Sequence, residues 1–445
     1  MEGMFENGVS PKKFTGFVFP SIVMMIVLSL YYTIDAILVA NYAGDDALAT
    51  LSIAYPVMGI VWGVSVMLAA GSSAIVAMKL GMRKFREANE KFTQIIIVAL
   101  ILSAIMILLF NVFMDPIVGF LGATGKLTPL CSSYLKILVW CTPAAFAGVV
   151  FEYYIRVDGH PTFTLFLYLF SGAVHIITAW ILMGKFGWGI EGAALGTVVG
   201  MWMSAVIGFI YFISGKSKLK FAGSKKPDWH YIGHSMVNGS SELVSEASDG
   251  IMTFFFNMIM LRLAGPPGVA ALSVVLSIHY CFISLHIGYI TGLAPLISYY
   301  YGAKDYKKIN TFIKYSRNFI IVSSVALTLL CWFGAPALVS IFDDPGSEVY
   351  ELSVHGMRIL SPVFILVGLT IFSSGFFTAY GNGQISALIS LSRTLIAVIA
   401  FAFLLSALFG IDGLWLAPFA AEAVTAVMAV FIFRKYKGKY HYSLK

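Results

Sequence analysis

Charged side chains are scarce in this chain of 445 residues, at 11% of the total, against about 25% in soluble globular domains. Hydrophobic residues make up 59% before any of the 41 glycines are counted. A water-soluble core of this length could not bury that much apolar surface, whereas a bilayer requires it. The composition therefore argues against a soluble enzyme or binding domain and predicts a membrane protein.

Cysteines and catalytic motifs are also sparse. The four cysteines lack the spacing of metal ligands, so inert buried thiols are predicted. The stretch 187–192 matches GxGxxG, but it joins two apolar segments and follows no strand. The sequence contains no P-loop and no paired nucleophile and base. We therefore expect no enzyme activity, no ATP-driven pump within this chain and no cofactor.

Long apolar runs recur along the whole chain. Crossing the hydrocarbon core takes about 20 apolar residues in a helix. Twelve segments of this kind are predicted, at 14–42, 51–80, 92–114, 130–155, 163–185, 192–214, 232–263, 270–301, 312–342, 353–379, 385–408 and 413–434. The expected fold class is an all-α membrane protein with twelve transmembrane helices.

Lysine and arginine are distributed unevenly between the loops. With both termini on the inner side, 24 of the 29 Lys and Arg fall on that side, Arg156 and Arg393 among them. Cytoplasmic loops carry an excess of Lys and Arg. We therefore expect a multi-pass protein of the plasma membrane (a bacterial-type inner membrane) with both termini in the cytoplasm. This asymmetry explains the net charge of +7 without a nucleic-acid partner.

The two halves of the chain repeat at a fixed offset of 221 residues. Gly71 corresponds to Gly292 and Gly81 to Gly302. Two bundles of six helices that enter the membrane in the same orientation are related by a pseudo-twofold axis along the membrane normal, with a substrate cavity between them. A duplication that only supports structure is the alternative. The predicted units are an N-lobe (1–214), a basic cytoplasmic linker (215–231) and a C-lobe (232–445).

Three acidic residues interrupt the seventh predicted helix. Glu242, Glu246 and Asp249 follow one another at i, i+4 and i+7, so they share one helical face. A charge at bilayer depth costs at least a few kcal/mol, and such acids mark ion, proton or substrate paths. Three carboxylates on one stripe repel one another when all are ionised, which suits a proton carrier. A polar network tied to a neighbouring helix is the structural alternative.

Other polar residues lie within or beside apolar segments. Asp35 lies toward the outer end of the first predicted helix, where a solvated helix end is the alternative interpretation. Glu152 precedes Arg156 by one helical turn, so a mutually neutralising ion pair is the simplest interpretation. An aromatic face beside a carboxylate can hold an organic cation. The candidate substrate contacts are Tyr32, Tyr55, Glu152, Phe256, Asn257 and Tyr280. Hydrogen-bonded helix residues, rather than ligands, are expected at His175, His279 and His286.

The order and spacing of several motifs resemble the multidrug and toxic compound extrusion (MATE) family over nearly the whole chain. They include Asp35, RVDGHP at 156–161, GSSELVSE at 239–246, SYYYGAK at 298–304 and GLWLAP at 413–418. The resemblance implies an antiporter that expels amphipathic, often cationic compounds in exchange for protons or Na⁺. It also implies that the first-helix aspartate and the seventh-helix acids, here Asp35, Glu246 and Asp249, are coupling or substrate sites.

This chain departs from the family pattern in its fifth predicted helix. Many relatives carry an Asn and an Asp four residues apart there, whereas this chain reads HIITA at 175–179. A Na⁺ site built from two aspartates in the first lobe is therefore in doubt. The coupling role falls to Asp35 with Glu152 or to the second lobe.

We therefore predict a secondary-active multidrug efflux transporter that works by alternating access. Asp35, Glu242, Glu246 and Asp249 are the predicted coupling residues, and a Na⁺ site, if the ion is Na⁺, would lie at Asp35 or at Glu246 with Asp249. The expected partners are small cationic molecules and the lipid bilayer, and the expected state is a monomer. A flippase or exporter of a lipid-linked or endogenous metabolite on the same fold is the nearest rival, and an uncoupled channel is a further one.

Overall fold

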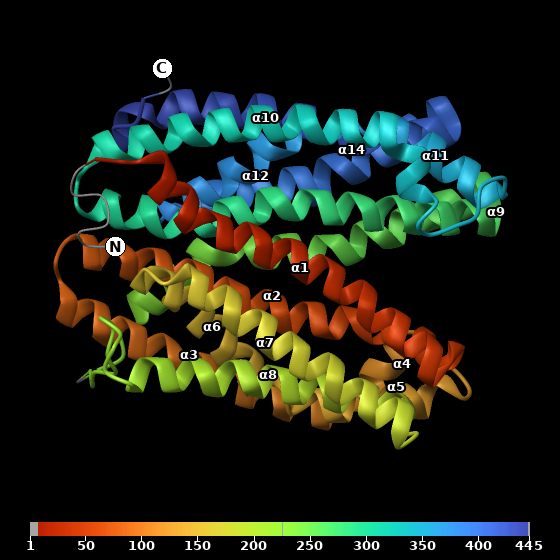
Figure 1. Ribbon diagram of the computed structural model, residues 1–445, viewed down its shortest axis with the longest axis horizontal. Helices are drawn as coiled ribbons and strands as arrows, with labels where there is room; N and C mark the ends of the chain where they lie inside the picture. Colours follow the sequence, from red (N-terminus) through yellow and green to blue (C-terminus); the bar gives the residue numbers. More distant parts are fainter. Residues whose placement is uncertain (1–7, 225, 444–445) are drawn as a thin grey trace.

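The computed structural model describes residues 8–224 and 226–443, except for the side chains of Tyr32 and Asp45, and these residues are almost entirely helical (Figure 1). Helices dominate because backbone groups inside a bilayer have to be hydrogen-bonded within their own segment. The first half contains α1 (Pro11–Ala43), α2 (Asp45–Gly81), α3 (Phe85–Val112), α4 (Met114–Phe120), α5 (Leu127–Val139), α6 (Thr142–Asp158), α7 (Pro161–Trp180), the π-helix η1 (Ile181–Lys185) and α8 (Gly189–Ile213). The second half contains α9 (Trp229–Gly302), α10 (Tyr306–Val339), α11 (Glu348–Leu360), α12 (Val363–Ala379), α13 (Gly383–Leu391), the π-helix η2 (Ser392–Ile396) and α14 (Ala397–Tyr440).

The predicted twelve-helix fold is confirmed. Among the described residues, eight helical runs are long and apolar enough to cross a membrane, and two bent pairs add two more spans. The remaining two arise because α9 and the run Gly383–Tyr440 each contain two spans. Gly265 (φ 63°) and Gly410 (φ 60°) break these runs with a backbone conformation that glycine adopts without steric cost.

Two spans that were predicted as continuous helices are bent. The segment 130–155 is α5 followed by α6 at 50°, and the segment 353–379 is α11 followed by α12 at 58°. Pro143 is the second residue of α6, and Pro362 is the N-cap residue of α12. Proline lacks the backbone N–H that would continue the helix and restricts the residue before it, which explains both bends.

The helices form two groups, and α1 runs diagonally past both (Figure 1). Helices α2–α8 lie on one side and α9–α14 on the other, and both termini lie at one end, which we call the terminal end. There α1 begins against α10, where the ring of Phe14 stacks on Phe312 with centroids 5.5 Å apart. Tyr315 donates a hydrogen bond of 3.2 Å to the backbone oxygen of Val9. The lobe boundaries at 214 and 232 and the orientation in the membrane stay predictions.

The two groups meet closely at the terminal end, where α2 contacts the first half of α9 backbone to backbone. A Cβ atom on Gly71 would lie 2.0 Å from the backbone oxygen of Ser235, and one on Gly239 would lie 1.9 Å from that of Met67. Asn238, fully buried, donates from Nδ2 to the backbone oxygen of Gly71 at 3.1 Å. Side chains larger than hydrogen cannot occupy the two glycine positions without separating these helices.

Equivalent glycines make equivalent contacts on the other side of the predicted axis. A Cβ atom on Gly292, in the second half of α9, would lie 3.0 Å from the Cβ of Ser21 on α1. A Cβ atom on Gly81 of α2 would lie 2.0 Å from the backbone oxygen of Tyr299 on α9. A Cβ atom on Gly302 of α9 would lie 2.1 Å from the backbone oxygen of Met78 on α2. The repeat found in the sequence is therefore a repeat of helix contacts, as a pseudo-twofold arrangement requires.

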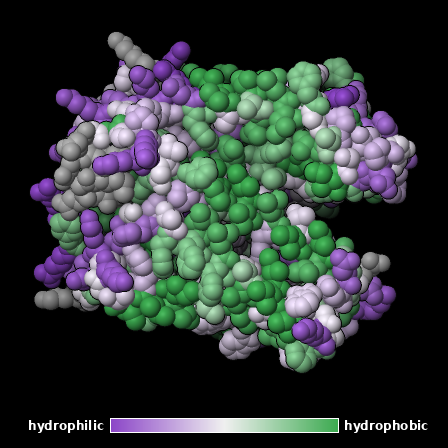
Figure 2. Space-filling model, in the orientation of Figure 1, coloured by the Kyte–Doolittle hydropathy of each residue, from purple (hydrophilic) through white to green (hydrophobic). Residues whose placement is uncertain are grey.

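The far end of the molecule is open. Figure 2 shows an apolar band across the middle, polar residues at both ends and a deep notch between the two groups at the end away from the termini. The structure is thus closed at the terminal end and hollowed at the other.

The linker between the halves lies against α3. The backbone N–H groups of Lys220 and Ala222 donate to the side chains of Asn89 (3.0 Å) and Thr93 (2.9 Å). Lys91 forms an ion pair with Asp228, the residue that caps α9. The hydrogen bond from Lys91 lowers the pKa of Asp228.

The assignment of two basic residues to inner loop stretches is wrong. Arg156 lies within α6 and is 1% exposed, and Arg393 lies within η2 with 12% of its side chain exposed. Both are held inside helical bundles by polar partners, so the charge asymmetry rests on the other Lys and Arg.

Candidate functional site

The acidic stripe of α9 lies where the closed contact ends and the notch begins. Glu242, Glu246 and Asp249 are partly buried in the first half of α9. A Cβ atom on Gly63 of α2 would lie 3.2 Å from the Cβ of Glu246, so this residue packs against α2. Tyr55, two turns further along α2, is 55% exposed and interacts electrostatically with Glu246 and Asp249. The stripe therefore borders the notch.

The three carboxylates have no fixed partner. Within residues 8–224 and 226–443, no side chain or backbone group forms a hydrogen bond or an ion pair with the side-chain carboxylates of Glu242, Glu246 and Asp249. The same residues contain no cluster of three or more His, Cys, Asp and Glu that could hold a metal ion. Carboxylates that are partly buried and unpaired can take up a proton, an ion or a cationic ligand.

Asp35 lies beside His175, a pairing that we did not predict. The Oδ1 atom of Asp35 lies 3.3 Å from Nε2 of His175, and their side chains are 18% and 3% exposed. The hydroxyl of Thr197 lies 3.3 Å from the same nitrogen. Gly200 on α8 allows a close approach of α7, because a Cβ atom there would lie 2.7 Å from the Cβ of His175. Asp35 is therefore part of a polar group inside the first half of the molecule and does not lie at a solvated helix end.

Glu152 and Arg156 are both buried, but their side chains do not form the expected ion pair. Arg156 donates from Nε to the backbone oxygen of Glu152 (3.1 Å), and its guanidinium lies 4.4 Å from the centre of the Tyr153 ring. The carboxylate of Glu152 accepts a 3.2 Å hydrogen bond from Ser204 instead. The expected direct contact does not form because the arginine folds back onto its own helix, although the two buried charges still interact electrostatically. Glu152 is 8% exposed, which places it inside the bundle.

The other candidate substrate contacts differ in position. Tyr55 borders the notch, whereas Phe256 is 1% exposed and belongs to the hydrophobic core. Asn257 and Tyr280 are partly buried on the two halves of α9. The side chain of Tyr32 lies outside the described part of the structure. The structure brings Tyr55 together with the acidic stripe.

The two histidines in the second half of α9 have different surroundings. Nε2 of His286 lies 3.0 Å from the hydroxyl of Ser323. The ring of His279 packs against Phe364, with centroids 5.5 Å apart. Hydrogen bonding therefore accounts for His286, while the contact found for His279 is aromatic.

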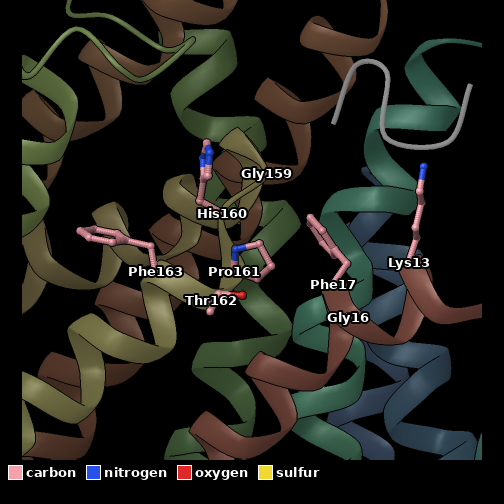
Figure 3. A pocket seen from close by; sticks show the side chains of 8 residues that line it. All are labelled: Lys13, Gly16, Phe17, Gly159, His160, Pro161, Thr162 and Phe163. Carbon is pink, nitrogen blue, oxygen red and sulfur yellow. The ribbon is translucent and has the colours of Figure 1, made fainter.

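A cavity of about 400 Å³ lies elsewhere, between the start of α1 and the turn from α6 to α7 (Figure 3). Lys13 and Phe17 lie on one side of it and His160 and Phe163 on the other. Its lining contains no carboxylate, so it is separate from both acidic groups.

Comparison with known proteins gives a consistent result. The MatE family model matches residues 20–181 and 244–404. The multidrug export protein MepA of Staphylococcus saprophyticus is 25% identical over 433 residues, covering 94% of this chain and 93% of its own. MepA of Staphylococcus aureus (strain MSSA476) is 24% identical over 443 residues, with coverages of 96% and 94%. A MATE structure in complex with MaL6 has a TM-score of 0.92 at 20% identity, covering 97% of this chain and 98% of that one.

Proposed function

Because this chain belongs to the MatE family of multidrug and toxic compound extrusion transporters, we propose that it exports amphipathic cations across the plasma membrane in exchange for protons or Na⁺. Its relatives named as multidrug export proteins support the substrate class. The basic terminal end lies in the cytoplasm in this proposal, so the notch faces outward.

The observation that carries the proposal is the unpaired acidic stripe at the border of the notch. A carboxylate that has no protein partner is stabilised by whichever cation reaches it, an organic substrate or the coupling ion. Because both compete for Glu246 and Asp249, entry of one favours release of the other. The closed contact between α2 and α9 keeps the two sides of the membrane from being connected through the stripe.

The Asp35 group supports protons rather than Na⁺ in the first lobe. Asp35 faces an imidazole nitrogen at 3.3 Å, and hard cations such as Ca²⁺ and Mg²⁺ prefer oxygen ligands. An imidazole beside a carboxylate can instead hold or pass on a proton. If Na⁺ is the coupling ion, Glu246 and Asp249 are the residues we propose for it.

The test is efflux of a fluorescent organic cation from proteoliposomes under an imposed pH gradient or Na⁺ gradient. Uphill movement driven by one gradient identifies the ion. Glu246→Gln keeps the fold and abolishes the driven movement, whereas Glu351→Gln, an exposed glutamate of α11, leaves it unchanged. Undiminished efflux by the Glu246→Gln variant would show that the acidic stripe does not couple transport to the gradient. Cation movement that does not depend on either gradient would favour the uncoupled channel. Transport of a lipid-linked compound but not of organic cations would favour the flippase.

A further inference from the structure

Arg393 is a largely buried basic residue that the proposed cycle has not used. It lies in η2, and its Nε donates a 3.0 Å hydrogen bond to Oε1 of Glu422 on α14. The other oxygen of Glu422 accepts a 2.5 Å hydrogen bond from Thr370 on α12. The side chains of Arg393 and Glu422 are 12% and 6% exposed. Glu422 is thus held from two directions inside the second bundle.

The helix is built irregularly at this point. A π-helical turn separates α13 from α14, and the hydroxyl of Ser392 lies 3.1 Å from that of Thr425, one turn beyond Glu422. Such turns cost hydrogen-bond geometry and are frequent at functional sites. Here the turn places Arg393 beside Glu422, which lies 29 residues later on α14, beyond the break at Gly410.

The guanidinium is only partly engaged by Glu422. Its two terminal nitrogens make no hydrogen bond to the described residues, and they are not among the fully buried polar atoms without partners. They therefore reach accessible space. Arg393 also interacts electrostatically with Glu242 and Asp249 of the stripe and with His279 and His286. Helix η2 also packs against α9, so the guanidinium and the acids of the stripe lie on neighbouring elements.

We propose that Arg393 is a tethered counter-ion that sets the affinity of the acidic stripe for cations, and that Glu422 holds it back. This inference rests on the proposed function of the stripe. While Glu422 binds the guanidinium, Glu242, Glu246 and Asp249 have no fixed cation and remain available to substrate. A guanidinium released from Glu422 neutralises part of the stripe, as a substrate cation does.

The two partners of this ion pair are expected to act in opposite directions. Glu422→Gln frees the guanidinium and weakens equilibrium binding of a fluorescent organic cation, such as rhodamine 6G, to the purified protein. Arg393→Gln removes the competing cation and therefore tightens binding of the fluorescent cation. A unit charge about 10 Å away at an effective dielectric constant of about 20 changes affinity about tenfold. The double variant Arg393→Gln/Glu422→Gln restores the charge balance and binds within about threefold of the unmodified protein.

A purely structural ion pair gives a different pattern. Both single variants then lower binding and thermal stability together, and that result overturns the inference. The exposed pair Arg86–Glu90 (3.0 Å) provides the control, because Glu90→Gln leaves affinity unchanged. Should Glu422→Gln not fold, Glu422→Asp keeps the charge but shortens the side chain, so it weakens binding by less in the same direction. An unmodified protein that binds no organic cation would overturn the proposed function itself.

Discussion

Asp35 on α1 and His175 on α7 lie side by side although they are 140 positions apart in the sequence. Close to His175 also lie the hydroxyl of Thr197 and the edge of the Tyr31 ring, whose centroid is 5.0 Å from that of His175. A buried carboxylate depends on such a neighbour because burial without a hydrogen bond or a charge partner is costly. In the proposed function, we therefore expect the imidazole to influence which cation or proton Asp35 accepts.

His175→Ala is expected to lower gradient-driven efflux while cation binding to the α9 stripe stays unchanged. Oδ1 of Asp35 accepts no hydrogen bond from the described residues, so the variant removes the one imidazole nitrogen that lies 3.3 Å from it, and a buried carboxylate without a nearby partner is costly. Efflux and binding are measured on the same proteoliposome preparation. His286→Ala is the matched control, since His286 is a buried histidine bonded to Ser323 in the other half. An equal loss of efflux in both variants would show that His175 has no special role.

The residues most easily predicted from sequence were the acids. Asp35 and Glu246 stand out because ionisable residues are rare in apolar segments. His175 was missed as the partner of Asp35 because no local spacing connects two helices that meet only in the folded chain. Arg393 was placed in a loop because a count of basic residues along the chain carries no information about the buried Glu422 on α14.

At the scale of elements, the closest helix contact depends on glycine. Gly239→Ala places a Cβ atom where the backbone oxygen of Met67 lies 1.9 Å away. We expect it to separate α2 from α9 and to lower stability by about 1–3 kcal/mol, as overpacking does. Thermal unfolding in detergent measures this. Gly233→Ala is the control in the same helix, because a Cβ atom there meets nothing within 4 Å. If both variants unfold at the same temperature, the contact does not hold the terminal end closed.

The positions of the helices were predictable and their bends were not. Bilayer thickness fixes the length of an apolar run, so all twelve segments coincide with observed spans. The segments 232–263 and 270–301 even anticipate the break at Gly265. The bends at α5–α6 and α11–α12 were not predicted, although Pro143 and Pro362 indicate them. The hydrophobicity of a segment is the same whether or not its helix bends, so an apolar run alone does not predict a bend.

At the scale of the whole molecule, the terminal end is closed and the far end is open, and the acidic stripe lies at the border between the closed contact and the notch. The sequence repeat predicted two related bundles, and the equivalent contacts of Gly71 and Gly292 agree with it. Which end of the bundle pair is closed could not be predicted, since the same helices can pack in more than one arrangement with few changes of local structure. The alternating access that we propose requires the α2–α9 contact to separate during each cycle.

That separation can be measured by cysteine labelling in a variant without the four native cysteines. Tyr55→Cys, 55% exposed beside the stripe, is expected to react with a membrane-impermeant maleimide from the outer side at rest. Ser235→Cys, fully buried against Gly71, is expected to react from the inner side only when substrate and an ion gradient drive turnover. Ser316→Cys is equally buried but lies within the second bundle, bonded to Tyr289, and should stay unlabelled throughout. Labelling of Ser235→Cys that does not depend on turnover would mean that the terminal end does not open as part of transport.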